Sequence, residues 1–254
     1  MSLGGAKTVI SDKSAANEEQ KRSFESQSNK FGSSQKEKSS FGKSSSRDLE
    51  EDMSSSDSRN VKSDKSTTNE SGSSASESTS NKFGKTAKSK TDYNKSSTRD
   101  LVDKTETIDG DIVDSSTDTD SSTDNEAYSK SFESVSDKSG TNIKEDISAG
   151  KSSTRKLGES VVWPDSDTTT NTDYIASNQA ARSISDTSIN SRGEKKQIIK
   201  QESGKSSQRN IVAAVKTDSG TVEQRDDSGD QSFQKRTIQT GFGCAGKPPV
   251  KHCH

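Results

Sequence analysis

Apolar positions are sparse along this chain, and they show no sustained helical period and no sustained strand alternation. Long stretches of Ser, Thr, Asn, Asp and Lys separate single Phe, Leu, Ile or Val residues. Two more apolar runs, 159–163 (ESVVW) and 210–215 (NIVAAV), are rich in β-branched residues and predict short strands. Residues 197–200 (QIIK) are compatible with either a short helix or a short strand.

The low content of apolar residues also determines the fold class that we expect. Hydrophobic residues make up 22% of the chain and charged residues 31%, whereas a globular domain carries roughly 45–50% apolar residues. Ordering a residue costs roughly 1–2 kcal/mol, and apolar burial returns about 25 cal/mol per Å². We therefore expect an intrinsically disordered, low-complexity chain with no globular fold. At most it would form isolated short strands or helices, with intermolecular β-structure when concentrated.

A heptapeptide nevertheless recurs four times at intervals of 52, 56 and 54 residues. Residues 11–62 and 63–114 also align without gaps, with 23 identities in 52 positions that include SDKS and SNKFG, and this indicates duplication. The copies of the heptapeptide are KSSSRDL (43–49), KSSTRDL (95–101), KSSTRKL (151–157) and KSSQRNI (205–211).

The repeat divides the chain into segments. Because solenoid repeats need an apolar face that stacks on the next unit, we interpret this repeat as compositional and its heptapeptide as a sticker between chains. The segments are 1–10 (leader), 11–62 (repeat 1), 63–118 (repeat 2), 119–172 (repeat 3), 173–226 (repeat 4, degenerate) and 227–254 (a C-terminal tail that contains cysteine).

Charge narrows the possible partners. The chain has 38 Lys and Arg against 40 Asp and Glu, finely interleaved, for a net charge of −2. A chain with balanced charges lacks the positive electrostatic potential that attracts a basic tail to nucleic acid, so no nucleic-acid partner is expected. No apolar run reaches the 18 or so residues of a membrane span, so no membrane partner is expected either. The N-terminal MSLGGAKTVI lacks the apolar stretch of a secretory signal peptide.

Catalytic constellations are missing from the sequence. Its two histidines, His252 and His254, both stand in the last three residues, and no rigid scaffold is visible to hold a nucleophile and a base together. No glycine-rich phosphate loop is present. We predict that the protein is not an enzyme and uses no cofactor.

The C-terminal tail carries both cysteines, Cys244 and Cys253. Together with His252 and His254 they could ligate zinc, but their spacing fits no standard zinc finger. Disulfide formation, within the tail or between chains, is the interpretation we favour.

Two kinds of covalent modification are possible. An acidic residue stands three positions after each of four serines, and this predicts phosphorylation at Ser54, Ser74, Ser97 and Ser121. Asn69 and Asn94 stand in glycosylation sequons, which are used when a chain enters the secretory pathway.

The repeats resemble the sericins, the serine-rich hydrophilic glue proteins that coat moth silk. The SDKS, SNKFG and KSS(S/T)R(D/K)L blocks carry the resemblance, together with DSSTDTD at 114–120 and a C-terminal GCAGKPPVKHCH. The resemblance implies a secreted protein that associates with itself and with other silk or matrix chains, and that is cross-linked through Cys244 and Cys253. The chain departs from the best-known members because it lacks Gly-Ser-Tyr tracts and has three tyrosines.

The sequence therefore predicts a secreted structural or adhesive protein that acts through many weak hydrogen bonds and ion pairs. One alternative is a phosphorylated extracellular protein of a matrix or mineral surface. The other is an intracellular disordered protein that protects against stress or acts as a hub.

Overall fold

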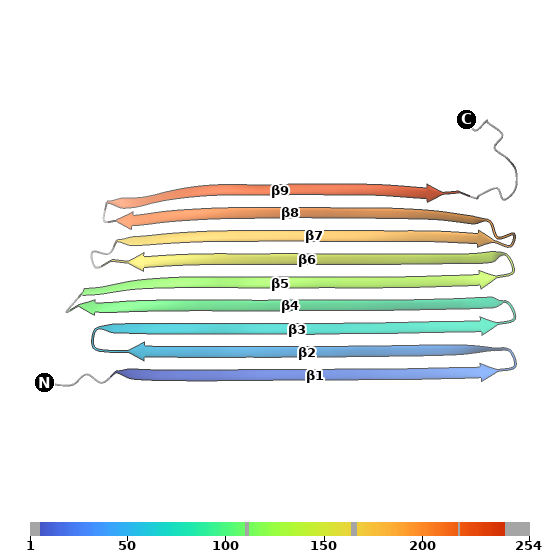
Figure 1. Ribbon diagram of the computed structural model, residues 1–254, viewed down its shortest axis with the longest axis horizontal. Helices are drawn as coiled ribbons and strands as arrows, with labels where there is room; N and C mark the ends of the chain where they lie inside the picture. The colour runs from blue at the N-terminus through green and yellow to red at the C-terminus, as the bar shows by residue number, and fades with distance from the viewer. Residues whose placement is uncertain (1–5, 110–111, 164–166, 218, 242–254) are drawn as a thin grey trace, which may run out of the picture.

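The computed structural model describes residues 6–109, 112–163, 167–217 and 219–241, and these residues form one antiparallel β-sheet (Figure 1). The strands follow one another in sequence order, each paired with the next, so that the sheet is a continuous meander. The strands are β1 (Lys7–Asn29), β2 (Gly32–Ser54), β3 (Ser58–Asn81), β4 (Gly84–Asp109), β5 (Ile112–Asp137), β6 (Gly140–Val162), β7 (Thr168–Asn190), β8 (Lys195–Thr217) and β9 (Gly220–Thr240).

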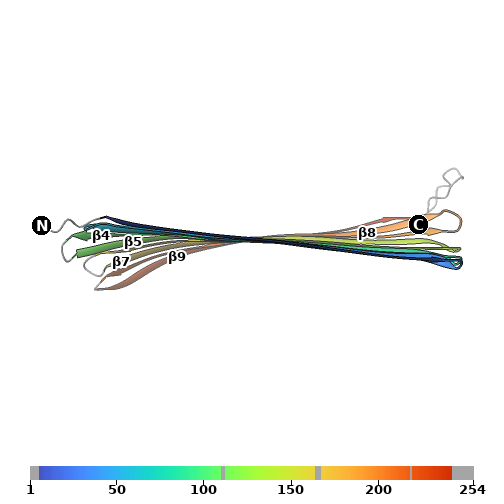
Figure 2. The same cartoon turned by 90° about the horizontal axis from the view of Figure 1, so that it is seen from below.

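The sheet is a single twisted layer. Figure 2 shows it edge-on, and no second layer of the described residues covers either face. None of the described residues is buried, so this part of the chain has no hydrophobic core. The chain exposes 18641 Å², whereas a compact protein of its mass would expose roughly 11,000 Å². Every side chain that the structure describes is therefore in contact with solvent on at least one side.

The prediction of a disordered, low-complexity chain is wrong. The segments 159–162 and 210–215 do lie in strands, but they are parts of β6 and β8, which are 23 residues long, and residues 197–200 lie in β8 as well. Strands of globular proteins usually have about 3–10 residues. The prediction counted apolar burial alone. In this sheet, neighbouring strands are instead joined along their full lengths by the backbone ladder and by pairs of polar side chains.

The sequence repeat is a pair of strands with its two turns. Lys43 of β2 pairs with Glu70 of β3, Glu70 pairs with Lys95 of β4, and the row continues through Glu126 to Lys151. The first residues of the heptapeptide copies thus lie in one row across the sheet. Their spacing of 52, 56 and 54 residues is the chain length from one even-numbered strand to the next. The interpretation of a merely compositional repeat is therefore also wrong.

The repeated SNKFG block forms the hairpin turn. Asn29 and Gly32 are the last pair of β1 and β2, and Asn81 and Gly84 are the last pair of β3 and β4. The Asn81 Oδ1 accepts hydrogen bonds from the backbone N–H groups of Phe83 (2.8 Å) and Gly84 (3.2 Å). Asn at the first position and Gly at the fourth are the residues that a β-turn favours. This turn sets the register of the β1–β2 and β3–β4 hairpins.

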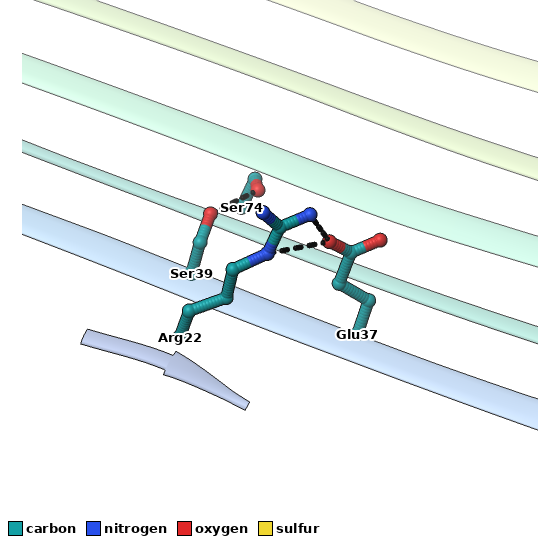
Figure 3. A network of polar contacts seen from close by, with 4 residues as sticks. All are labelled: Arg22, Glu37, Ser39 and Ser74. Atoms are coloured by element: carbon teal, nitrogen blue, oxygen red, sulfur yellow. Dashed lines mark hydrogen bonds and ion pairs between the residues drawn. The ribbon is translucent and has the colours of Figure 1, made fainter. Parts of the chain in front are cut away.

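Neighbouring strands are joined by diagonal ion pairs and by hydroxyl pairs, as Figure 3 shows near the β1 edge. Arg22 of β1 donates from Nε (3.1 Å) and from Nη2 (2.6 Å) to Glu37 Oε1 of β2. The hydroxyl groups of Ser39 in β2 and Ser74 in β3 are 2.8 Å apart. Each such pair contributes roughly 0.2–1 kcal/mol, so their combined effect depends on their number.

Candidate functional site

The heptapeptide distributes its side chains between two different faces. Successive residues of a strand point to opposite sides, so Lys95, Arg99 and Leu101 lie on one face and Ser96 and Thr98 on the other. Directly paired residues share a face, which places equivalent residues of all copies together. We call the first side the leucine face, after Leu49, Leu101 and Leu157, and the second the asparagine face, after Asn69, Asn125 and Asn178.

A row of alternating charge crosses the leucine face. It runs from Glu18 of β1 to Lys151 of β6, with Glu on odd-numbered strands and Lys on even-numbered strands. The Lys151 Nζ is 2.6 Å from Glu126 Oε1, and Lys95 Nζ is 3.9 Å from Glu70 Oε1. Each charge therefore has an opposite charge on a neighbouring strand, and this favours the native pairing of strands over a shifted one.

In three of the four copies, the arginine of the heptapeptide makes a two-pronged ion pair with an aspartate of the preceding strand. Arg155 donates to both oxygens of Asp120 (3.1 and 2.8 Å), and Arg209 donates to both oxygens of Asp173 (3.0 and 2.7 Å). Arg99 and Asp64 form the corresponding pair at 3.5 and 3.2 Å. Two parallel bonds fix the geometry as well as the attraction, so these pairs define the register more sharply than single contacts would.

A mixed apolar and acidic row lies next to these arginines on the leucine face. Leu101 and Leu157 on even-numbered strands alternate with Asp64, Asp120 and Asp173 on odd-numbered strands. They line a shallow hollow of about 700 Å³. The three aspartates of this row are bound to arginines, so the row combines paired charges with small apolar patches.

The asparagine face carries an uncharged band at the level of the heptapeptides. The band consists of three neighbouring rows, which pass through Thr98, Ser96 and Asn94 of β4 and extend from β2 to β9. At the overall charged fraction of 31%, about seven of its 24 positions would be charged, and none is. Its middle row alternates amides with hydroxyls: Asn69, Ser96, Asn125, Ser152, Asn178 and Ser206.

The uncharged band is also shallow and built from small side chains. From β5 to β8 the third row holds only Ala127, Gly150, Ala180 and Gly204, and Phe233 of β9 stands at the end of that row. Two open hollows of about 820 and 870 Å³ are lined by these residues. The directly opposite part of the leucine face is instead occupied by the Lys, Glu and Arg rows.

Ion pairing shifts the titration of the carboxyl groups in the sheet. The hydrogen bond from Arg155 holds the pKa of Asp120 below its ordinary value, and Arg209 lowers the pKa of Asp173 in the same way. The hydrogen bond from Lys151 likewise lowers the pKa of Glu126. In each case the folded sheet favours the ionised carboxylate.

We therefore expect the sheet to lose stability in acid. A carboxyl whose pKa is depressed by folding stabilises the native state above its unfolded pKa of about 4 and loses this effect as the pH falls through the lower, folded value. The thermal midpoint followed by circular dichroism should be nearly constant from about pH 7 to 5 and should fall below about pH 4. The Arg155→Gln/Arg209→Gln variant should show a smaller fall. An equally steep fall in wild type and variant would show that these ion pairs are not its cause.

All six predicted modification sites lie in strands. Asn69 and Asn94 are exposed on the asparagine face, on neighbouring strands within the uncharged band. Ser74 and Ser97 are half-exposed on the leucine face, and Ser54 and Ser121 are half-exposed on the asparagine face. The structure thus brings the two sequons together and leaves the four serines on separate strands.

The predicted cross-linking or metal-binding residues Cys244, His252, Cys253 and His254 lie outside the described residues. Within the described ranges, no three His, Cys, Asp or Glu side chains gather closely enough to hold a metal ion. The same part of the chain contains no helix long and apolar enough to cross a membrane.

Comparison with known proteins finds no relative: no protein-family model, no curated protein and no solved structure matches the chain.

Sequence reasoning missed the separation of the two faces. The signal was present in KSSTRDL at 95–101, where Lys, Arg and Leu stand at even spacings of four and two residues while the intervening positions hold Ser, Thr or Asp. This is the strand period of two. Here the alternating residues differ in charge and size, whereas strand alternation is usually recognised as apolar residues alternating with polar ones.

Proposed function

We propose that the protein is a structural, self-associating protein that coats or joins fibres, as the resemblance to sericins implies. One observation carries the proposal: the described residues form an open single-layer sheet that buries none of its side chains. Such a surface offers hydroxyl, amide, ammonium and carboxylate groups in regular rows, and many weak contacts add up over a large area.

The two edge strands support association between copies. β1 and β9 each pair with one neighbour, so that their outer backbone groups have no strand partner within the sheet. Apart from Ser11 and Ile238, their residues are exposed along the whole strand. A long exposed edge is a template on which another strand can add. We also propose that the protein is secreted, that silk or matrix chains are its partners, and that Cys244 and Cys253 cross-link it.

Adhesion of dried films tests the proposed function. We expect the chain to adsorb to a silk fibroin film and to hold two such films together after drying, because its rows of bonding groups become desolvated together. A chain of identical composition, with the residues of each strand shuffled, is the control and should give at most about half the peel force. Equal peel force from both chains would contradict the proposal, since it would show that composition alone is responsible.

A further inference from the structure

We infer that the uncharged band on the asparagine face is the surface through which a second copy of this chain stacks on the first. The inference rests on the proposed self-association and specifies its surface. It commits to face-to-face stacking of two sheets at the level of the heptapeptides, with the leucine faces directed outward.

The first reason is the lack of any enclosed interior in the described part of the chain. A single-layer sheet must offset the entropy of ordering its residues with contacts on its faces. The chain exposes 18641 Å², whereas a compact protein of this mass would expose roughly 11,000 Å². The difference is surface that is available for such contacts.

The second reason is the distribution of charge. Stacking on the leucine face would desolvate the rows of Lys95, Glu126 and Arg155, which costs free energy even when the ions are paired. The uncharged band has no ion to desolvate from β2 to β9. Its amides and hydroxyls are both donors and acceptors, so that they can bond to the same groups of a second copy.

The third reason is shape. The third row of the band lets another backbone approach closely, since none of its side chains from β5 to β8 is larger than a methyl group: Ala127, Gly150, Ala180 and Gly204. Steric zippers between sheets use the same close approach, with amide ladders adding hydrogen bonds. Here amides alternate with hydroxyls across neighbouring strands, and Asn125 Nδ2 donates to Ser152 Oγ at 3.4 Å.

The fourth reason is area. Three rows on one face extend roughly 20 Å along the strands, and eight strands extend roughly 38 Å across them. The product, close to 800 Å² for each partner, is about the size of a standard specific protein–protein interface. A second copy can thus be held by the band alone, without the charged rows on either side of it.

Neighbouring serines provide a matched test. Ser96 and Ser152 lie in the band, whereas Ser97 and Ser153, one residue further along the same strands, lie on the leucine face, and all four are half-exposed. The Ser96→Lys/Ser152→Lys variant and the Ser97→Lys/Ser153→Lys control therefore have the same composition and net charge. They differ in the face that receives the lysines.

Sedimentation equilibrium of the full chain, in reducing buffer so that disulfides do not contribute, measures the association. We expect the dissociation constant of the band variant to rise at least about a hundredfold, because lysines of two copies would face one another without partners. The control should change less than about threefold. Ser96→Gln/Ser152→Gln, which adds bulk without charge, provides a second variant if the lysine variant does not give the circular dichroism spectrum of the wild type. It should also weaken association by more than the control does.

The outcomes separate the two proposals. If the wild type is monomeric at every concentration, both the proposed function and the stacking inference fail. If the wild type associates but the band variants and the control have equal dissociation constants, the stacking inference alone is overturned, and association occurs through the edges β1 and β9 or the leucine face.

Discussion

A single alanine inserted between Ser152 and Ser153 should lower the free energy of unfolding by about 2–4 kcal/mol, because it reverses the faces of the rest of β6. After the insertion, Arg155 and Leu157 would point to the asparagine face, and Arg155 would lose both of its bonds to Asp120. A bulge could restore the faces, but β6 is paired on both sides, so a bulge would disrupt two ladders at once. Chemical denaturation at fixed protein concentration measures the effect.

The control is the same alanine inserted between Ser56 and Asp57, in the loop that joins β2 to β3. Here the added residue changes the loop length and leaves every strand register intact, so the cost should be below about 0.6 kcal/mol. A similar loss of stability from both insertions would contradict the view that register between the heptapeptide copies holds the sheet together.

The repeat is visible in the sequence alone, whereas the prediction of the fold class was wrong, and the heptapeptide illustrates the physical reason. The alignment of KSSTRDL at 95–101 with KSSTRKL at 151–157 was visible without any structure, and so was their spacing. Counting apolar residues led to the prediction of disorder, because that criterion assumes that a fold needs a core. It assigned no value to a register in which three of the four heptapeptide lysines meet a Glu, and three of the four arginines meet an Asp, on a neighbouring strand.

The turns were equally visible and equally misread. SNKFG at 28–32 and 80–84 was recognised as a repeated block, but an Asn followed three residues later by Gly is also a turn signal. With turns at these positions and the heptapeptides placed in one row, the hairpins follow directly. The uncharged band could not be found in this way, since it exists only once strands distant in sequence, such as β3 and β7, are aligned in one sheet.

Replacing Gly140 by alanine should destabilise the sheet by about 2–5 kcal/mol, since it combines backbone strain with a steric overlap. Gly140 begins β6 with a φ of +144°, a conformation that residues with a side chain rarely adopt. An added Cβ would overlap the carbonyl oxygen of Ile189 and lie 2.9 Å from the Cα of Asn190. Both are backbone atoms of β7, an interior strand that is held by its own ladders and cannot easily move.

Two other glycines separate the contributions of strain and overlap. Gly220 has a φ of +142° but open space around it, so Gly220→Ala should cost about 1–3 kcal/mol from strain alone. Gly150 lies within β6, and the atom nearest to an added Cβ would be the carbonyl oxygen of Gln179, at 3.8 Å. Gly150→Ala should therefore change the free energy of unfolding by less than about 0.5 kcal/mol. Urea denaturation should rank the losses Gly140 first, Gly220 second and Gly150 last. Equal stability of Gly140→Ala and Gly150→Ala would contradict the close contact between Gly140 and the backbone of β7.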